Sequence, residues 1–238
     1  MTAIPLYQPP IEYPTSDGKP MGETTLHRKV IMDLIQGLES RFRDDPEVWV
    51  GGDLFLYYRK GEPRYVVCPD VLLVHGVRKW DRPVFFLWEE RPPSLIVEVT
   101  SPSTSQEDTS KKKELYERLG VEEYVLFDPY GEYLMPPLQG FRLERSRYKP
   151  IPLEPDGALS SRTAGVSLRR EPNTGGDGER LRLFDTSTGA IILRPEEIEA
   201  ERRALEQELR EVQDEIARNE QRTAALEAEI ARLRAERG

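Results

Sequence analysis

The stretch SLIVEVT (94–100) decides the fold, because it reads as a buried strand that carries a single charge. Turn-forming residues bound it on both sides, at Pro92-Pro93 and at Ser101-Pro102, as expected of a short strand. Alternation puts Leu95, Val97 and Val99 on one face and Ile96, Glu98 and Thr100 on the other. A buried carboxylate is costly unless it has a cationic partner, hydrogen bonds or a metal ion. Glu98 is therefore the first candidate functional residue.

A second carboxylate occurs in PDVLLV (69–74), where Asp70 follows a proline and precedes an apolar run. Two carboxylates on neighbouring strands form a hard, oxygen-rich site of the kind that Mg²⁺ (or Mn²⁺) occupies, completed by water and substrate phosphate. Such a site favours phosphodiester hydrolysis. Taken one at a time, Asp70 and Glu98 are better explained by a salt bridge or a loop cap, so only the pair indicates a metal site.

A helix predicted over 110–119 supplies a cation. Among the three consecutive lysines 111–113, only Lys112 shares the i, i+3, i+4, i+7 stripe with Leu115, Tyr116 and Leu119. We therefore expect Lys112 to face the sheet, where its charge would stabilise the negative charge developing on a phosphate. The alternative is that Lys112 runs along the helix edge with its amine in solvent.

The other core elements follow from hydrophobic periodicity. Apolar residues recurring every three to four positions predict a helix over 24–42. Two runs rich in β-branched and aromatic residues, separated by the turn-like KGEP, predict an antiparallel hairpin over 48–75. EYVLFD (123–128) predicts a further strand, joined to 94–100 by a right-handed connection if the two are parallel. The predicted core order is α-β-β-β-α-β, an α/β (α+β) fold, while residues 133–193 indicate only short β segments of undefined topology.

These motifs resemble a known family. PDVLLV, PSLIVEVTSPST (93–104), the spacing Asp108-x3-Lys112-x3-Tyr116 and GVEEYVLFDP (120–129) resemble the Uma-type restriction endonucleases of the PD-(D/E)XK nuclease superfamily. The resemblance covers about residues 20–193 and implies a restriction endonuclease-like fold with the α-β-β-β-α-β core. It implies that Asp70 is the motif aspartate and Glu98 the first residue of the (D/E)XK triplet, both of them metal ligands.

The sequence departs from the superfamily pattern at the third position of the triplet. Thr100 stands where the superfamily usually has lysine. The resemblance implies that the lysine has migrated to the following helix, which makes Asp70, Glu98 and Lys112 the expected catalytic set. Asp108, just before the predicted helix, is interpreted as an N-cap in preference to a ligand.

The segment 195–238 is rich in Ala, Glu, Arg and Leu and predicts a coiled coil. Its heptad core positions are Ile198, Arg202, Leu205, Leu209, Val212, Ile216, Asn219, Thr223, Leu226, Ile230 and Leu233. Isoleucine-rich a positions with leucine-rich d positions favour a parallel homodimer, in which the polar layer at Asn219 and Thr223 can fix the register. The alternative is a solitary charged helix stabilised by i,i+4 pairs.

Composition excludes several classes of protein. The chain has 238 residues, a net charge of −9, one cysteine and two histidines. One cysteine excludes a disulfide scaffold, and two histidines with one cysteine provide no zinc set, so Cys68, His27 and His75 are interpreted as structural. An acidic chain is not a general polyanion binder, so contacts with DNA must be local. Without a leader-like or membrane-spanning segment, we expect a cytoplasmic protein.

We expect three parts: an extended arm over 1–20, a nuclease-like domain over 21–193 and a dimerising coiled-coil helix over 195–238. The leading hypothesis is a Mg²⁺-dependent endonuclease that hydrolyses DNA phosphodiester bonds as a homodimer. The alternative is a catalytically inactive nuclease fold that serves as a binding or assembly module through its coiled coil. The net charge of −9 and the missing triplet lysine favour this alternative.

Overall fold

The computed structural model describes residues 11–16 and 24–236. It divides into two compact units, the first ending at Ile192 and the second beginning at Leu193. Among the described residues, no helix combines the length and the apolar character that crossing a membrane requires.

The expected arm over 1–20 is described only at residues 11–16; its other residues lie outside the described part of the chain. The Tyr13 ring packs edge-on against Tyr57, with ring centroids 4.9 Å apart. The Tyr57 hydroxyl donates a hydrogen bond to the Pro14 carbonyl at 2.6 Å. This part of the arm therefore lies against the folded domain.

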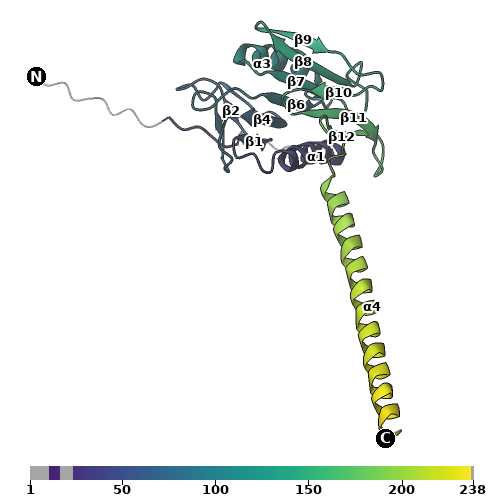
Figure 1. Ribbon diagram of the computed structural model, residues 1–238. Helices are drawn as coiled ribbons and strands as arrows, with labels where there is room; N and C mark the ends of the chain where they lie inside the picture. Colours follow the sequence, from purple (N-terminus) through teal and green to yellow (C-terminus); the bar gives the residue numbers. More distant parts are fainter. Residues whose placement is uncertain (1–10, 17–23, 237–238) are drawn as a thin grey trace, which may run out of the picture. The chain divides into compact units, whose positions relative to one another are not determined.

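A mixed sheet forms the centre of the first unit (Figure 1). Within the described residues it has six strands in the order β1-β4-β6-β7-β8-β9. They are β1 (Val48–Gly51), β4 (Val71–His75), β6 (Leu95–Val99), β7 (Glu123–Phe127), β8 (Leu138–Glu144) and β9 (Arg147–Ile151). β6 and β7 are parallel and the other neighbours are antiparallel, so the expected strand–helix–strand unit is confirmed.

The helices complete the expected α-β-β-β-α-β order. Helix α1 (Thr25–Arg41) precedes β1, and a helical segment lies between β6 and β7. That segment consists of α2 (Ser105–Glu107), the π-helical turn η1 (Asp108–Lys112) and α3 (Lys113–Leu119). The sequence prediction of a helix over 110–119 is therefore too short, because the chain already turns after Ser101, whose carbonyl accepts hydrogen bonds from the backbone N–H groups of Thr104 and Ser105.

Both faces of the central sheet are buried. Along β4, Val71 and Leu73 pack in one apolar cluster with α1, whereas Leu72 and Val74 pack in another that contains Tyr116 of α3. The strand β6 alternates in the same way, which confirms the two faces predicted for it. A sheet covered on both sides explains why its strands read as nearly continuous apolar runs.

The predicted hairpin over 48–75 is confirmed in its antiparallel pairing but is divided between two sheets. β1 pairs with β4, from Val48 opposite His75 to Gly51 opposite Leu72. Between them, β2 (Leu56–Tyr57) and β3 (Val66–Val67) pair in a small sheet with β5 (Phe85–Phe86). The break follows Gly52, where a Cβ atom would overlap the carbonyl oxygen of Asp70.

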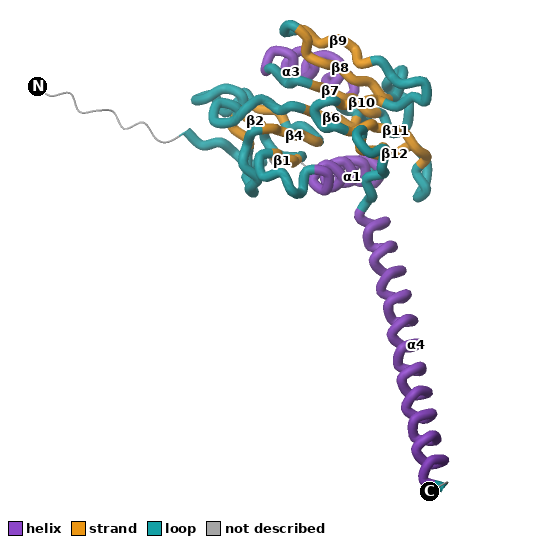
Figure 2. Tube along the Cα trace, viewed as in Figure 1, coloured by secondary structure: helices purple, strands orange, loops and turns teal. Residues whose placement is uncertain are grey.

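The region 133–193 also forms a second antiparallel sheet, in the order β10-β11-β12 (Figure 2). Its strands are β10 (Leu159–Ser161), β11 (Val166–Pro172) and β12 (Glu179–Asp185). β12 packs against α1, and the guanidinium of Arg180 on β12 donates two hydrogen bonds of 2.8 Å to Asp33 on α1. The second sheet thereby holds α1 against the core.

The second unit contains helix α4 (Pro195–Ala235), which has 41 residues and no buried residue. Proline occupies the first turn, and Glu197 accepts a hydrogen bond from the backbone of Arg194, the helix cap. The eight apolar side chains of its heptad seam are 42% to 64% exposed. The helix alone leaves this seam uncovered in the described part of the chain.

Candidate active site

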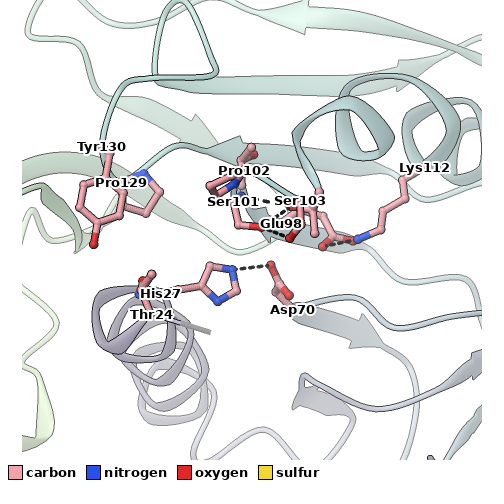
Figure 3. A pocket seen from close by; sticks show the side chains of 12 residues that line it. Thr24, His27, Asp70, Glu98, Ser101, Pro102, Ser103, Lys112, Pro129 and Tyr130 are labelled. Atoms are coloured by element: carbon pink, nitrogen blue, oxygen red, sulfur yellow. Dashed lines mark hydrogen bonds and ion pairs between the residues drawn. The ribbon is translucent and has the colours of Figure 1, made fainter. Parts of the chain in front are cut away.

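A cavity of about 390 Å³ opens where β4 and β6 meet the start of α1 (Figure 3). Its floor and walls come from four parts of the chain that are distant in sequence. The lining residues are Thr24, His27, Asp70, Glu98, Thr100, Ser101, Pro102, Ser103, Thr104, Lys112, Pro129 and Tyr130. All three residues expected to form the catalytic set therefore lie at one cavity.

Glu98 lies at the inner end of the cavity, and its side chain is 1% exposed. Its Oε2 accepts a hydrogen bond from Lys112 Nζ at 2.9 Å, and its Oε1 accepts one from the Tyr116 hydroxyl at 2.7 Å. Burial raises the pKa of Glu98 to about 8; Lys112 opposes the shift and Asp70 adds to it. The unusual carboxyl that the sequence singles out is thus both buried and tightly held.

Asp70 immediately precedes β4 and remains partly open to the cavity, with its side chain 20% exposed. Its Oδ2 accepts a hydrogen bond from the backbone N–H of Val99 at 2.7 Å. This bond links the start of β4 to the end of β6. Gly52 also lies close to this residue, because a Cβ atom at position 52 would overlap the Asp70 carbonyl oxygen.

Lys112 points toward the sheet, as the helical stripe predicts. Its ammonium lies 2.9 Å from Glu98 Oε2 and 3.0 Å from Asp108 Oδ1, and its side chain is 14% exposed. Burial lowers the pKa of Lys112, but the two carboxylates outweigh burial, so the net shift is upward. Lys113 instead places its ammonium over the Phe141 ring, 3.5 Å from the centroid.

The prediction that Asp108 is an N-cap is wrong. Asp108 lies inside the helical segment, where its backbone N–H donates to the Thr104 carbonyl and its side chain is 1% exposed. The helix starts earlier than its apolar stripe, so the first charged residue before that stripe is already in a turn. The spacing of four residues between Asp108 and Lys112 is the sequence signal for the ion pair that they form.

His27, which the sequence analysis interprets as structural, also lines the cavity. Thr24 caps α1 by accepting a hydrogen bond from the His27 backbone N–H at 3.1 Å. The imidazole then reaches the end of β6, where Nε2 lies 2.6 Å from the Val99 carbonyl oxygen and 3.7 Å from Asp70 Oδ2. The side chain is 10% exposed. Its interpretation as merely structural rested on the absence of a zinc set and did not consider this contact.

The donor set of the cavity fits a divalent cation. Glu98 lines the cavity, and the buried Asp108, which lies outside the lining, shares with it the ammonium of Lys112. Asp70 adds a third carboxyl group at the cavity wall. A divalent cation beside Glu98 would favour the ionised form of this carboxyl group, which burial opposes. Among the described residues, no group of three or more His, Cys, Asp or Glu side chains could hold a metal ion, so an ion at Asp70 and Glu98 would need water and substrate oxygens as its other ligands.

Hydroxyl groups and one aromatic ring form the outer wall. The Ser101 hydroxyl lies 3.0 Å from that of Ser103 and 3.1 Å from that of Thr104. Tyr130 is 43% exposed and follows the buried Asp128, whose carboxylate accepts hydrogen bonds from the backbone of the 130–134 loop. Local hydrogen bonds therefore hold both the hydroxyl groups and the loop that carries Tyr130 in place. Trp88, by contrast, stacks on Phe86 away from the cavity lining.

The chain is similar to a protein family and to solved structures. One similar solved structure is described as "a putative nuclease belonging to DUF820 from Anabaena variabilis ATCC 29413"; it is 17% identical, with a TM-score of 0.45, and the match covers 66% of this chain and 86% of that chain. No curated protein matches the chain. The profile of the Uma2 family, described as "Putative restriction endonuclease", matches residues 6–171. Because this match spans more than half of the 238 residues, the chain belongs to the Uma2 family.

Proposed function

We propose that the protein is a Mg²⁺- or Mn²⁺-dependent endonuclease that hydrolyses phosphodiester bonds in DNA. The observation that carries this proposal is the convergence of Asp70, Glu98 and Lys112 on one cavity. Each residue comes from a different element, so the convergence is a property of the fold and not of a local sequence pattern. Membership of a family described as restriction endonucleases supports the same chemistry.

Asp70 and Glu98 would hold the metal ion, because their carboxylate oxygens line the cavity and are hard donors. When bound, the ion would polarise a phosphoryl oxygen, lower the pKa of a water molecule and stabilise the leaving oxygen. Tyr116 and Lys112 orient Glu98 from two sides. A carboxylate fixed in this way loses little conformational freedom when a ligand binds.

Lys112 supplies the positive charge beside the phosphate. The carboxylates of Glu98 and Asp108 favour its ammonium form and aim it at the cavity. A fixed ammonium stabilises the negative charge that develops on the phosphoryl group without reorganising during the reaction. The hydroxyl groups of Ser101, Ser103 and Thr104 line the cavity and can donate hydrogen bonds to the DNA backbone. Such local contacts suit a chain whose net charge is −9.

We further propose that α4 forms a parallel homodimeric coiled coil. Its eight exposed apolar side chains recur at heptad spacing, which is typical of a seam that a second helix covers. A parallel pair would bring two Asn219 side chains together in the seam, and such a polar layer specifies register. Two nuclease units in one dimer could each cut one strand of a duplex.

The alternative function is a binding or assembly module without catalysis. The specific observation in its favour is Thr100, which occupies the usual place of the triplet lysine and is 2% exposed. In this alternative the cluster around Glu98 stabilises the fold only, and the coiled coil carries the function.

The two functions differ in their response to divalent cations. Plasmid and single-stranded DNA are incubated with Mg²⁺ or Mn²⁺ and the wild-type chain, Glu98→Gln, Lys112→Ala or the control Lys113→Ala. The endonuclease proposal expects cleavage that requires the cation, is lost in the first two variants and is kept in the control. Cleavage that persists in both Glu98→Gln and Lys112→Ala, or a complete absence of cleavage by folded wild-type protein, contradicts it.

A further inference from the structure

Tyr130 lines the cavity on the side away from its charged groups (Figure 3). In that view the Tyr130 ring lies at one end of the cavity, while Glu98 and Lys112 lie toward the other. Tyr130 is 43% exposed, and the proposed hydrolysis gives it no role. We propose that the Tyr130 ring stacks on an unpaired nucleobase of the bound DNA. This inference rests on the proposed function, because it concerns DNA in the same cavity.

A buried carboxylate fixes the loop that carries Tyr130. Asp128 is fully buried, and its Oδ1 accepts hydrogen bonds from the backbone N–H groups of Tyr130 at 3.1 Å and Gly131 at 3.0 Å. Its Oδ2 accepts two more, from the backbone of Tyr133 and Leu134. The backbone that presents the ring is therefore ordered before a ligand arrives, which lowers the entropic cost of binding.

The Gly-rich turn between β11 and β12 supports the same loop from the second sheet. The backbone N–H of Glu179 donates a hydrogen bond of 2.7 Å to the Pro129 carbonyl. Gly178 has a φ of +88°, and a Cβ atom there would lie 2.9 Å from the Pro129 oxygen and 3.2 Å from Tyr130 Cδ1. Only glycine lets the turn approach the ring this closely. The second sheet, which lies outside the α-β-β-β-α-β core, thus helps to build this wall of the cavity.

The size and surface of the cavity suit a flat organic group as well as an ion. Its volume of about 390 Å³ lies within the range of about 300–1,000 Å³ that is usual for small-molecule sites. Pro102 and Pro129 add apolar surface to that of Tyr130. Every nucleobase has a flat face that can stack on an aromatic ring.

The charge of the cavity leaves much of the affinity for DNA to such a contact. Among the described residues that line it, Lys112 is the only lysine or arginine, and two carboxylates already share its ammonium. The chain as a whole carries a net charge of −9. Few phosphate contacts are therefore available. Stacking on Tyr130 adds affinity that does not require neutralised phosphates.

The base that Tyr130 contacts must be unpaired. Inside a duplex the neighbouring bases cover both faces of each base. An aromatic side chain can therefore stack only on a base of a single strand or on one that has left the helix. The inference thus defines the substrate as DNA that presents an unpaired nucleotide beside the cleaved bond.

Photocrosslinking of the full wild-type chain locates the contact without a variant. The probe is a single-stranded oligonucleotide with one 5-iodouracil base, which on irradiation loses its iodine atom and joins to an aromatic ring stacked on it. Mass spectrometry of the digested complex identifies the joined residue. The inference expects the cross-link at Tyr130, and cross-links confined to other residues overturn it.

Three variants measure the contribution of the ring. Tyr130→Ala should weaken binding of the single strand by about tenfold or more, whereas Tyr130→Phe, which keeps the ring, should bind like the wild type. Tyr133→Ala is the matched control, because Tyr133 lies in the same loop and is 38% exposed but does not line the cavity. An unchanged affinity in Tyr130→Ala, or an equal loss in Tyr133→Ala, overturns the inference.

Fluorescence anisotropy of a labelled oligonucleotide gives these affinities. Ca²⁺ takes the place of Mg²⁺ in the buffer, and gel electrophoresis verifies that the DNA stays intact. A fully paired duplex of the same sequence should bind more weakly than the single strand, and Tyr130→Ala should abolish the difference. A paired duplex that binds as tightly as the single strand overturns the requirement for an unpaired base.

The outcomes separate this inference from the proposed function. Cation-dependent cleavage that is lost in Glu98→Gln but unaffected by Tyr130→Ala, with cross-links elsewhere, overturns the inference and leaves the proposed endonuclease intact. A cross-link at Tyr130 in a folded chain that cleaves no DNA supports the stacking contact and contradicts the proposed hydrolysis. A wild-type chain that binds neither form of DNA overturns both.

Discussion

Arg180 on β12 donates two hydrogen bonds of 2.8 Å to Asp33 on α1, and both side chains are less than a tenth exposed. The pair joins residues that are 147 positions apart in the sequence. It connects the second sheet to the helix that carries His27, so it supports the cavity from a distance.

Replacing Arg180 with Ala should reduce the free energy of unfolding by about 3–5 kcal/mol, because a buried carboxylate would lose its cation. Arg170→Ala is the matched control on the neighbouring strand β11. Its ion pair with Glu179 is about a third exposed, so it should cost no more than about 1 kcal/mol. Urea unfolding measures both values. Similar losses in the two variants would show that the buried pair contributes no more to the free energy of unfolding than the exposed pair does.

Acid sensitivity should trace in part to Glu123 at the start of β7. Burial alone would raise its pKa, but hydrogen bonds from Ser161, Arg142 and Thr163 outweigh burial, so the pKa is lowered. A carboxyl group with a lowered pKa in the folded state stabilises the fold above its unfolded pKa of about 4.3, and this stabilisation is lost as the pH falls.

The free energy of unfolding should therefore decline from pH 5 to pH 3 more steeply in the wild type than in Glu123→Gln. Urea titrations at several pH values measure the slopes. Glu154→Gln, at an exposed position, serves as the control and should leave the wild-type slope unchanged. Parallel slopes for all three proteins would rule out Glu123 as a source of acid sensitivity.

The position of Asp70 should depend on Gly52. A Cβ atom at residue 52 would overlap the Asp70 carbonyl oxygen, so Gly52→Ala must displace the backbone that carries this carboxylate. We expect Mn²⁺ affinity to fall by about tenfold or more, the scale on which supporting contacts affect metal sites.

Gly175→Ala is the control for Gly52→Ala, because the nearest atom to its Cβ would be 3.5 Å away, at ordinary contact distance. Isothermal titration calorimetry gives the Mn²⁺ affinities, and thermal melting shows whether each variant is folded. A folded Gly52→Ala protein with the affinity of the wild type would disprove the link between the glycine and the site.

Dimerisation should depend on the seam of α4. Ile216→Asp places a charge among the apolar residues that a partner helix would cover, so the chain should change from a dimer to a monomer of 27.4 kDa. Ala217→Asp, on the adjacent position outside the seam, should remain dimeric. Sedimentation equilibrium of the full chain measures the masses, and a dimeric Ile216→Asp protein would locate the interface elsewhere.

Local sequence patterns predicted the elements whose burial is periodic. The alternation around Glu98 identified its face of β6, and the helical stripe through Lys112 predicted that this lysine faces the sheet. Both predictions need only the neighbouring residues. The catalytic roles of Asp70, Glu98 and Lys112 remain proposals, since a pattern of burial specifies location and not reaction.

The features that the sequence did not reveal depend on contacts between distant residues. His27 reaches Val99 across 72 positions, and nothing in the α1 pattern indicates where that helix starts relative to β6. The small sheet of β2, β3 and β5 likewise uses strands of two residues, which are too short to show alternation. The N-cap prediction for Asp108 is wrong because the helical segment begins at Ser105, before the apolar stripe on which the predicted boundary is based.

That turn has an evolutionary consequence. A π-helical turn holds one residue more than an α-helical turn, and it is equivalent to an insertion of a single amino acid. Removing one residue between Asp108 and Lys112 would therefore be absorbed by returning η1 to an ordinary α-helical turn, so the side chains of α3 would keep their faces. The helical segment can thus change its length by one residue at this point while Lys112 still faces Glu98.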